Sequence, residues 1–273
     1  MNETIGFIGL GDLGQPIACN LLAAGYALKV YNRTASKAEP LLALGAQQVF
    51  QPRDVLTRGG IVVSVVWDDA ALESIVMGEG FLEQLGPGGI HLSMSTVAPA
   101  TAQKLAAAHV ERGSYYVEAP VFGRHEAAVA RQLWICLAGP AAPKERVRPL
   151  LEATSQGVYD FGETIGAATL VKISGNFLGT AAVQAMIEVS NLAKKSGNDP
   201  TKVIDMLSQT LFSAPIYQSY GKRIAENPEY YAHHSRGPIP LKDVNLFKET
   251  ASQVESPTPL AHLLHNILST AEN

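Results

Sequence analysis

Residues 4–16 read TIGFIGLGDLGQP, and this stretch decides how the first half of the chain folds. Its opening residues are mostly β-branched or apolar, which predicts a buried strand at Thr4–Ile8. The pattern G-x-G-x-x-G follows directly and opens an apolar stretch with helical spacing at Leu13–Ala24. A strand, a glycine-rich turn and a helix in this order predict a site for the diphosphate of a dinucleotide.

Each glycine of the turn has its own role in such a site. Gly9 permits the tight turn, Gly11 lets a diphosphate approach the backbone, and Gly14 lets the helix pack on the strand. The diphosphate is then expected at the positive N-terminus of the helix. The residues of this turn that we predict to bind the cofactor are Gly9, Leu10, Gly11, Asp12, Leu13 and Gly14.

The end of the second predicted strand, Leu28–Tyr31, bears on the choice between NAD and NADP. An NAD site places Asp or Glu there to accept a hydrogen bond from the ribose 2′-hydroxyl, and a carboxylate would repel a 2′-phosphate. This chain has Asn32, Arg33 and Thr34 instead, with Lys37 one helical turn further on. Because these side chains can donate to a phosphate, we predict NADP as the cofactor, with NADPH preferred over NADH.

Short β-branched runs alternate with helical patterns as far as residue 161. Strands that are almost continuously apolar and alternate with helices predict a doubly wound parallel sheet of the Rossmann type, covered by helices on both faces. Further strands are expected at Ile61–Val66, Gly89–Met94, Tyr115–Glu118, Leu133–Leu137 and Gly157–Phe161. The helices between strands are expected at Ser36–Leu44, Pro99–Arg112 and Pro143–Glu152.

No strand pattern follows residue 161. A run without proline has apolar residues at helical spacing over Ala167–Lys195, which at ~1.5 Å per residue predicts a helix roughly 40 Å long. The fold class is therefore α/β: a Rossmann domain at residues 1–162, then an all-α domain for substrate binding and oligomerisation at residues 163–273, joined by a long interdomain helix. Further helices are expected at Pro200–Thr210, Pro215–Ala225, Lys242–Val254 and Pro259–Thr270.

Composition limits the kinds of partner and the compartment. The chain has 47% hydrophobic and 17% charged residues with a net charge of −4, so no basic field favours nucleic acid or an anionic membrane. Cys19 and Cys136 lie in apolar segments and are expected to be reduced and buried. No secretory signal opens the chain, and apolar runs such as Ile61–Trp67 are too short to span a bilayer, so we expect a cytoplasmic protein.

Further motifs recur along the chain in a fixed order after Gly6–Pro16 and Asn20-Leu21. They are Ser95-Thr96-Val97, Glu118-Ala119-Pro120-Val121, Gly162 and Gly166 with Lys172 and Asn176, and Lys242-Asp243. Together these motifs resemble the β-hydroxyacid dehydrogenases, a family that includes 3-hydroxyisobutyrate dehydrogenase and glyoxylate/succinic semialdehyde reductase. The resemblance covers essentially the whole chain. It implies an NAD(P)-dependent oxidoreductase that acts on CH–OH groups, with domains like those of 3-hydroxyisobutyrate and 6-phosphogluconate dehydrogenases.

The resemblance implies catalytic roles for two residues of the long helix. Lys172 matches the catalytic lysine of the family, and Asn176 matches its helping asparagine. They are four residues apart and so lie on one helix face. Hydride transfer to a carbonyl makes an alkoxide, and a lysine that is protonated at neutral pH can supply the proton. Asn176 can hold the carbonyl or the ammonium in line.

Three more residues are predicted to contact the cofactor. Thr96 falls in a loop after a strand, at the carboxyl edge where ligands bind in open α/β sheets, and the resemblance places it near both nicotinamide and substrate. Val66, at the end of another strand, is included in the same site. By resemblance, Lys242 would close over the cofactor from the helical domain.

The substrate loop departs from the family pattern, which usually reads Ala-Pro-Val-Ser-Gly-Gly and holds a carboxylate with its serine and glycines. Residues 119–124 read APVFGR here. Phe122 removes a hydroxyl donor and adds bulk, whereas Arg124 either restores a carboxylate contact or faces water, and both alternatives stay open. Ala168 also replaces a glycine common in the lysine motif. The predicted substrate-binding residues are Thr96, Phe122, Gly123, Arg124 and Asn176.

Two other functions are alternatives to the reduction of a small aldehyde or keto acid. Imine reductases have a similar fold but generally lack the lysine, although the apolar Phe122 favours them. A non-catalytic NADPH-binding protein is opposed by the presence of both Lys172 and Asn176. No metal site is expected, because His262 and His265 lack a Cys or carboxylate at suitable spacing. The expected partners are a carbonyl or hydroxy-acid substrate and further copies of the chain, as a homodimer or homotetramer.

Overall fold

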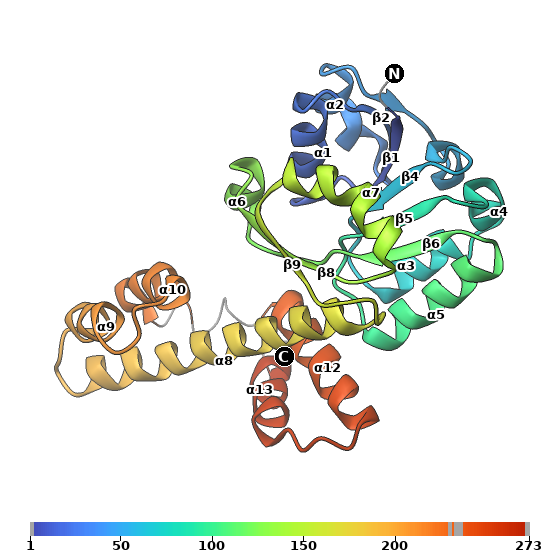
Figure 1. Cartoon of the computed structure of the whole chain (residues 1–273). Helices are drawn as coiled ribbons and strands as arrows, with labels where there is room; N and C mark the ends of the chain where they lie inside the picture. The colour runs from blue at the N-terminus through green and yellow to red at the C-terminus, as the bar shows by residue number, and fades with distance from the viewer. Residues whose placement is uncertain (1–2, 229–230, 232–236, 271–273) are drawn as a thin grey trace. The chain divides into compact units, whose positions relative to one another are not determined.

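The computed structural model of the chain describes residues 3–228, 231 and 237–270 (Figure 1). The chain divides into two units, Met1–Lys172 and Ile173–Asn273. The long helix α8 (Ala167–Lys195) begins in the first unit and continues in the second.

Six strands form the main sheet of the first unit in the order β3-β2-β1-β4-β5-β6, and every neighbouring pair is parallel. The chain passes from β3 back to β4 on the other side of β1, which is the strand order of dinucleotide-binding folds. The predicted Rossmann sheet is therefore confirmed. The strands are β1 (Thr4–Ile8), β2 (Ala27–Tyr31), β3 (Gln47–Gln48), β4 (Ile61–Ser64), β5 (Ile90–Ser93) and β6 (Tyr115–Glu118).

Helices cover both faces of this sheet because successive side chains of a strand point to opposite sides. Phe7 and Val63 belong to one buried core, and their neighbours Ile8 and Val62 belong to the other. The first core includes residues of α1 (Gly14–Ala23), α2 (Glu39–Leu42), α6 (His125–Val129) and α7 (Ala141–Glu152). The second includes residues of α3 (Asp69–Val76), α4 (Phe81–Leu85) and α5 (Pro99–Glu111), visible on the other side of the sheet (Figure 1).

The last three strands of this unit form a small sheet of their own. The sequence predicted the second and third of them as part of the parallel sheet and did not predict the first. β7 (Val121–Phe122) is antiparallel to β8 (Leu133–Leu137), which is parallel to β9 (Ser155–Asp160). The two-residue strand β7 is too short to show a period in sequence, and it reverses the chain direction before β8.

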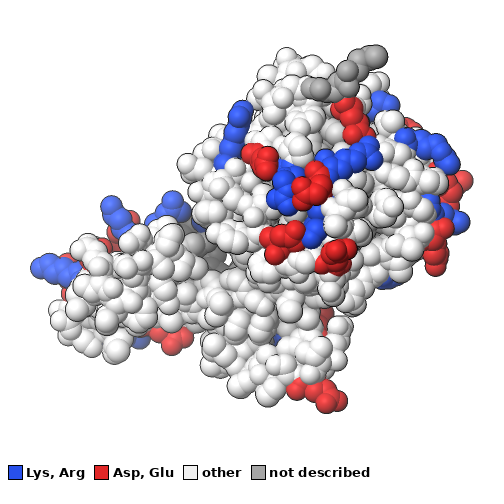
Figure 2. Space-filling view, viewed as in Figure 1, with Lys and Arg blue, Asp and Glu red and all other residues white. Residues whose placement is uncertain are grey.

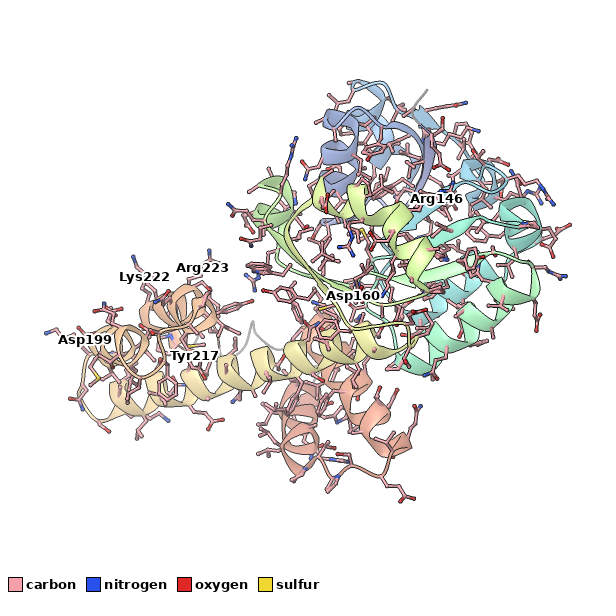
Figure 3. All side chains as sticks on the ribbon, viewed as in Figure 1. Arg146, Asp160, Asp199, Tyr217, Lys222 and Arg223 are labelled. Atoms are coloured by element: carbon pink, nitrogen blue, oxygen red, sulfur yellow. The ribbon has the colours of Figure 1, made fainter. Side chains whose placement is uncertain are left out.

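Two cationic side chains of α7 hold the layers of the first unit together. The ammonium of Lys144 donates to both carboxylate oxygens of Asp160, at 2.6 and 2.8 Å, and to the carbonyl of Gly162 at 3.0 Å. Arg146 donates to Glu3 and to two backbone carbonyls near the start of the sheet. Asp160 and Arg146 are labelled in Figure 3. Charged side chains of both signs gather over this part of the first unit (Figure 2).

Every secondary-structure element among the described residues of the second unit is a helix. α9 (Pro200–Gln209) and α10 (Pro215–Glu226) pack on the later part of α8 around Met186 and Ile204. α12 (Pro238–Gln253) and α13 (Pro259–Ser269) pack on its earlier part, where Phe177 stacks on Phe247 with ring centroids 4.2 Å apart. The predicted all-α domain is therefore confirmed.

Helix α12 begins four residues before the predicted start at Lys242. Pro238 and Pro240 lie in its first turn, where backbone N–H groups have no partner within the helix and proline is tolerated.

α8 is long and apolar enough to cross a membrane by length and composition alone, and 17% of its most apolar stretch is buried in the structure. In the sequence, only shorter apolar runs such as Ile61–Trp67 were judged, and the same test was not applied to this helix. α8 is the long helix that the sequence predicted at Ala167–Lys195, and it carries Lys172, Asn176 and Glu188 along its length.

Candidate active site

The glycine-rich turn between β1 and α1 has the shape that a dinucleotide diphosphate requires. Gly9 has a φ of +95°, and a Cβ there would lie 2.1 Å from the carbonyl oxygen of Val65. A Cβ at Gly14 would lie 1.9 Å from the carbonyl oxygen of Gly9, whereas one at Gly11 would meet nothing within 4 Å. Any larger side chain at Gly9 or Gly14 would therefore clash with the backbone. Gly11 leaves the space above the backbone open. No side chain caps the N-terminus of α1, so the residues present fit the cofactor.

Asn32 joins this turn to the end of β2. Its Oδ1 accepts from the backbone N–H of Leu10 at 2.9 Å, and its Nδ2 donates to the carbonyl of Thr34 at 2.9 Å. Arg33, Thr34 and Lys37 are exposed beside it. Asn32 therefore orders the loop, and the exposed side chains that follow it are the ones able to meet a 2′-phosphate.

Val66 and Thr96 lie on two loops that are joined at the carboxyl ends of β4 and β5. The N–H of Val66 donates to the Oγ of Ser95 at 2.9 Å, and Thr96 is the next residue along the chain. The carboxylate of Asp69 accepts from the N–H of Ala98 at 2.8 Å and fixes the same loop. The structure thus brings these two predicted cofactor residues to one edge of the sheet.

The predicted substrate loop is anchored on the glycine-rich turn through a residue that the sequence did not single out. The Nδ1 of His125, at the start of α6, donates to the carbonyl of Asp12 at 2.8 Å. Asn20 of α1 donates to the carbonyl of Ala128 at 2.7 Å. These contacts join segments more than 100 residues apart, so no local spacing could have indicated them.

Lys172 lies against the predicted substrate loop. Its Nζ is 4.4 Å from the centroid of the Phe122 ring. Phe122 packs with Ala168 and Cys136 in a small buried cluster. Burial raises the pKa of the Cys136 thiol to about 11, and the charge of Lys172 opposes this rise. The predicted proton donor and the residue that departs from the family pattern are thus in contact.

Glu118, the last residue of β6, caps the helix that carries Lys172. Its carboxylate accepts from the N–H of Gly166 at 2.9 Å and from the hydroxyl of Thr169 at 2.5 Å, and only 1% of the residue is exposed. Burial raises the pKa of this carboxyl, while the hydrogen bonds from Thr169 and the helix backbone oppose the rise. The sequence motif contained Glu118, but nothing in its spacing indicated the contact with α8.

In the second unit the structure joins two of the motifs by a hydrogen bond. Asp243, which is 7% exposed, accepts from the Nδ2 of Asn176 at 2.8 Å. Its other oxygen lies 3.4 Å from the Nζ of Lys242. Because a carboxylate only accepts, the amide nitrogen of Asn176 must face Asp243, and its Oδ1 faces the opposite side.

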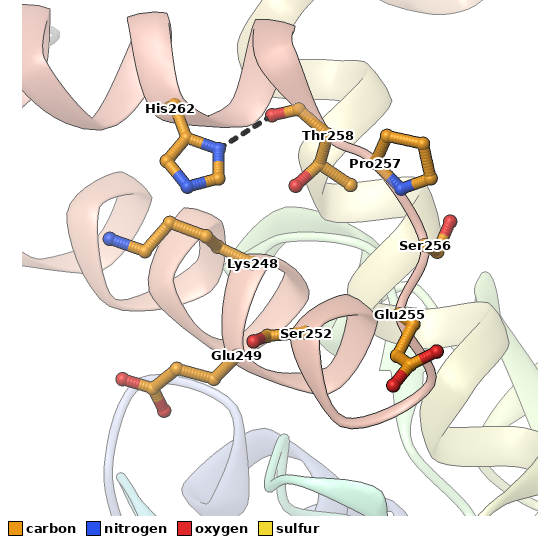
Figure 4. Close-up of a pocket in the computed structure, with 8 residues that line it drawn as sticks. All are labelled: Lys248, Glu249, Ser252, Glu255, Ser256, Pro257, Thr258 and His262. Carbon is orange, nitrogen blue, oxygen red and sulfur yellow. Dashed lines mark hydrogen bonds between the residues drawn. The ribbon is translucent and has the colours of Figure 1, made fainter.

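Two surface hollows lie within the second unit. One of 340 Å³ is lined by Lys242 and Asn245 among other residues of α12. The other, of 510 Å³, holds none of the predicted site residues, and His262 there donates to the carbonyl of Thr258 at 2.9 Å (Figure 4). Across the described ranges, no three or more His, Cys, Asp or Glu side chains cluster in a way that could hold a metal ion.

Two family matches cover nearly the whole chain. Residues 4–164 match the NAD binding domain of 6-phosphogluconate dehydrogenase. Residues 166–273 match the family described as NAD-binding of NADP-dependent 3-hydroxyisobutyrate dehydrogenase.

Relatives with similar sequences include two bacterial proteins and one plant protein. The uncharacterized oxidoreductase YfjR of Bacillus subtilis is 42% identical, covering 95% of this chain and 90% of that protein. NAD-dependent L-serine dehydrogenase of Pseudomonas aeruginosa is 30% identical, covering 96% and 89%. The chloroplastic glyoxylate/succinic semialdehyde reductase 2 of Arabidopsis thaliana is 28% identical, covering 99% and 75%.

Solved structures share the fold over the full length. 3-Hydroxyisobutyrate dehydrogenase of Salmonella typhimurium is 26% identical with a TM-score of 0.86, covering 100% of this chain and 95% of that one. Psf3, in complex with NADP+ and 2-OPP, is 27% identical with a TM-score of 0.82, covering 97% and 93%. A Streptomyces aurantiacus imine reductase, 20% identical with a TM-score of 0.64 and covering 98% and 94%, shares the fold alone.

Proposed function

Because the chain belongs to the β-hydroxyacid dehydrogenase family, whose NAD(P)-dependent oxidoreductases act on CH–OH groups, we propose that it interconverts a small aldehyde or keto acid and the corresponding hydroxy acid with NADPH. The observation that carries this proposal is the place of Lys172. Its ammonium lies 4.4 Å from the ring of Phe122 in the predicted substrate loop, so the proton donor and the substrate-binding segment meet.

Lys172 supplies the proton in this mechanism. The bound nicotinamide would supply the hydride. Lys172 gives its proton to the oxygen that gains negative charge, and the cap formed by Glu118 fixes the turn of α8 before it. Asn176 lies one turn later on the same helix. Its Oδ1, turned away from Asp243, accepts a hydrogen bond from the ammonium or from the hydroxyl of the product.

The preference for NADPH rests on the residues after β2. Relatives of this chain include an NAD-dependent enzyme and a protein with bound NADP+, so the family as a whole leaves the choice open. No carboxylate occupies the positions from Asn32 to Lys37, and Arg33, Thr34 and Lys37 are exposed. Arg33 is the strongest candidate to pair with the 2′-phosphate, because guanidinium binds phosphate with two parallel hydrogen bonds.

We further propose that residues 1–162 bind the cofactor and that residues 163–273 take part in substrate binding and in oligomerisation, within a cytoplasmic enzyme. Lys242 would contact the cofactor from this second part, and its position in a hollow of α12 is consistent with such a role. Thr96, Gly123 and Arg124 complete the proposed substrate site. The contact of Phe122 with Lys172 gives this site an apolar wall where the family has a serine.

Imine reduction is the second candidate, favoured by that apolar wall. It is opposed by Lys172, because the resemblance indicates that imine reductases generally lack a lysine here. A non-catalytic NADPH-binding protein is opposed by the same lysine and by the hydrogen-bonded pair of Asn176 and Asp243.

A substrate panel tests the proposal against both alternatives. The purified protein is assayed with NADPH and glyoxylate, succinic semialdehyde, uncharged aldehydes of similar size, and a cyclic imine. The proposal expects turnover of aldehydes or keto acids that exceeds that of the imine. Turnover of the imine alone supports an imine reductase, whereas tight NADPH binding without turnover of any compound supports a binding protein.

A further inference from the structure

The ring of Phe122 is held in place by the small sheet of the first unit. Phe122 belongs to β7 and pairs with Trp134 of β8. Its side chain packs against a buried cluster that contains Cys136 and Ala168, which are 4% and 0% exposed. A ring fixed by two strands and a helix has little freedom to move away from a neighbour.

The ammonium of Lys172 lies 4.4 Å from the centroid of this ring, within the distance at which a cation is attracted to the negative face of an aromatic ring. The carboxylate of Glu118 accepts hydrogen bonds from Gly166, just before α8, and from Thr169 in the first turn of α8. Glu118 therefore holds the start of this helix, and Phe122 contacts the charged end of the Lys172 side chain.

A π face suits a proton donor better than a carboxylate does. It stabilises the charged ammonium but is itself neutral, so it attracts the lysine less strongly than an ion pair in a partly buried site. When the proton leaves Lys172 for the alkoxide oxygen, the attraction that is lost to the ring is smaller than the attraction that would be lost to a carboxylate. Serine, the usual family residue at this position, offers no such face.

We propose that Phe122 is a positioning residue, which holds the protonated side chain of Lys172 by a cation–π contact and keeps it charged to higher pH than a non-aromatic residue would. This inference rests on the proposed role of Lys172 as the proton donor. It assigns Phe122 a function toward the lysine in addition to its place in the wall of the substrate site.

The contact itself is measured without any turnover. Protein labelled with [ε-¹³C]lysine is examined by NMR, and the Lys172 signal is assigned by its loss in Lys172→Met. We expect the protons on this carbon to be shifted upfield by the ring current in the native protein and in Phe122→Tyr, and to lose that shift in Phe122→Leu. Phe50→Leu, at a residue that is 74% exposed, is the matched control and should leave the signal unchanged.

The effect on the proton is measured from the pH dependence of kcat/KM. Activity that needs a protonated lysine falls as pH rises, because the donor is lost. Phe122→Leu should move this fall to lower pH by about 0.5 unit, the equivalent of a modest cation–π contact, and should lower turnover at alkaline pH. Phe122→Tyr keeps the π face and should restore the native profile.

Two results would overturn the proposal: a Lys172 signal without a ring-current shift in the native protein, or an unchanged pH profile in Phe122→Leu. Failure of the proposed function would give a different result from failure of the cation–π proposal. If Lys172→Met keeps its turnover, Lys172 is not the proton donor, while the NMR experiment still reports whether the ring contacts the ammonium.

Discussion

At the scale of single residues, the proposed preference for NADPH rests on the side chains at the end of β2. Asn32 uses both ends of its amide to order the loop, which leaves the exposed Arg33 as the charged group nearest to it in sequence. A guanidinium that pairs with the 2′-phosphate interacts with NADPH and has no equivalent partner in NADH.

Arg33→Ala should therefore weaken NADPH binding by ~1.5–3 kcal/mol, the cost of losing a charged hydrogen bond, and leave NADH binding nearly unchanged. Fluorescence titration with both cofactors measures this. Arg112→Ala, at an exposed arginine at the end of α5, controls for the loss of a surface charge. Equal weakening of both cofactors by Arg33→Ala would remove the assignment of NADP.

The sequence predicted the local geometry of the glycine-rich turn better than it predicted long-range contacts. Gly9, Gly11 and Gly14 could be assigned roles because the geometry of a turn is local. The contact of Phe122 with Lys172 joins residues 50 positions apart, and the bond from His125 to Asp12 spans 113. Contacts over such distances depend on how β7 and α6 are placed, which no periodicity reports.

Among the elements, β5 and α5 are joined by a buried chain of hydrogen bonds through two histidines. His91 bonds Ser64 at 2.8 Å and His109 at 3.1 Å, and His109 bonds Ser114 at 2.9 Å. Both imidazoles are fully buried. Burial lowers the pKa of His109 to about 4, and burial together with the neighbouring His109 lowers that of His91.

A lowered histidine pKa makes the fold less stable in acid. Below pH ~6.5 His109 takes up a proton in the unfolded chain but stays neutral in the folded chain. The free energy of unfolding therefore decreases as pH falls from about 6.5 to 4. For His109 this loss amounts to about 3 kcal/mol. Urea unfolding of His109→Gln, which cannot titrate, should show a correspondingly smaller loss between pH 7 and pH 4.

His262→Gln, at an exposed histidine of α13, should follow the native stability profile and serves as the control. If the stability of His109→Gln falls as steeply with acid as that of the native protein, His109 is not the group responsible.

Elements with a long periodic pattern were predicted well, and short ones were not. β1, β6, β8 and α8 have the predicted bounds because burial imposes a clear period on their residues. The two-residue strand β7 has no period to detect. Its reversal of the chain is the reason that β8 and β9 form a separate sheet. The main sheet could thus be predicted from local pattern, whereas the small sheet depends on tertiary pairing.

At the scale of the whole molecule, the second unit has little core of its own. Its helices form two small buried clusters at separate parts of α8. Leu178 and Leu192 of α8 are 65% and 68% exposed, and most of the surface of this unit shown in Figure 2 carries no charge. Exposed apolar surface of this kind is costly in water and is typical of surfaces that bind other protein chains.

We therefore predict that the protein is a homodimer or homotetramer. Sedimentation velocity measures this oligomeric state. Leu192→Glu, which places a charge on the exposed part of α8, should shift the population toward smaller species. Leu44→Glu changes a residue of the first unit that is 57% exposed, and it should leave sedimentation unchanged. A native protein that remains monomeric at every concentration contradicts the prediction.

The central claim is that Lys172 donates the proton in an NADPH-dependent carbonyl reduction, and its most direct test is the turnover of Lys172→Met on the best substrate of the panel. Methionine keeps an apolar stem of similar length and removes the donor. We predict that turnover falls about 10²- to 10⁴-fold with the affinity for NADPH preserved. Lys195→Met, at the other end of α8, should keep native turnover. A Lys172→Met protein that retains most of its turnover would contradict the claim.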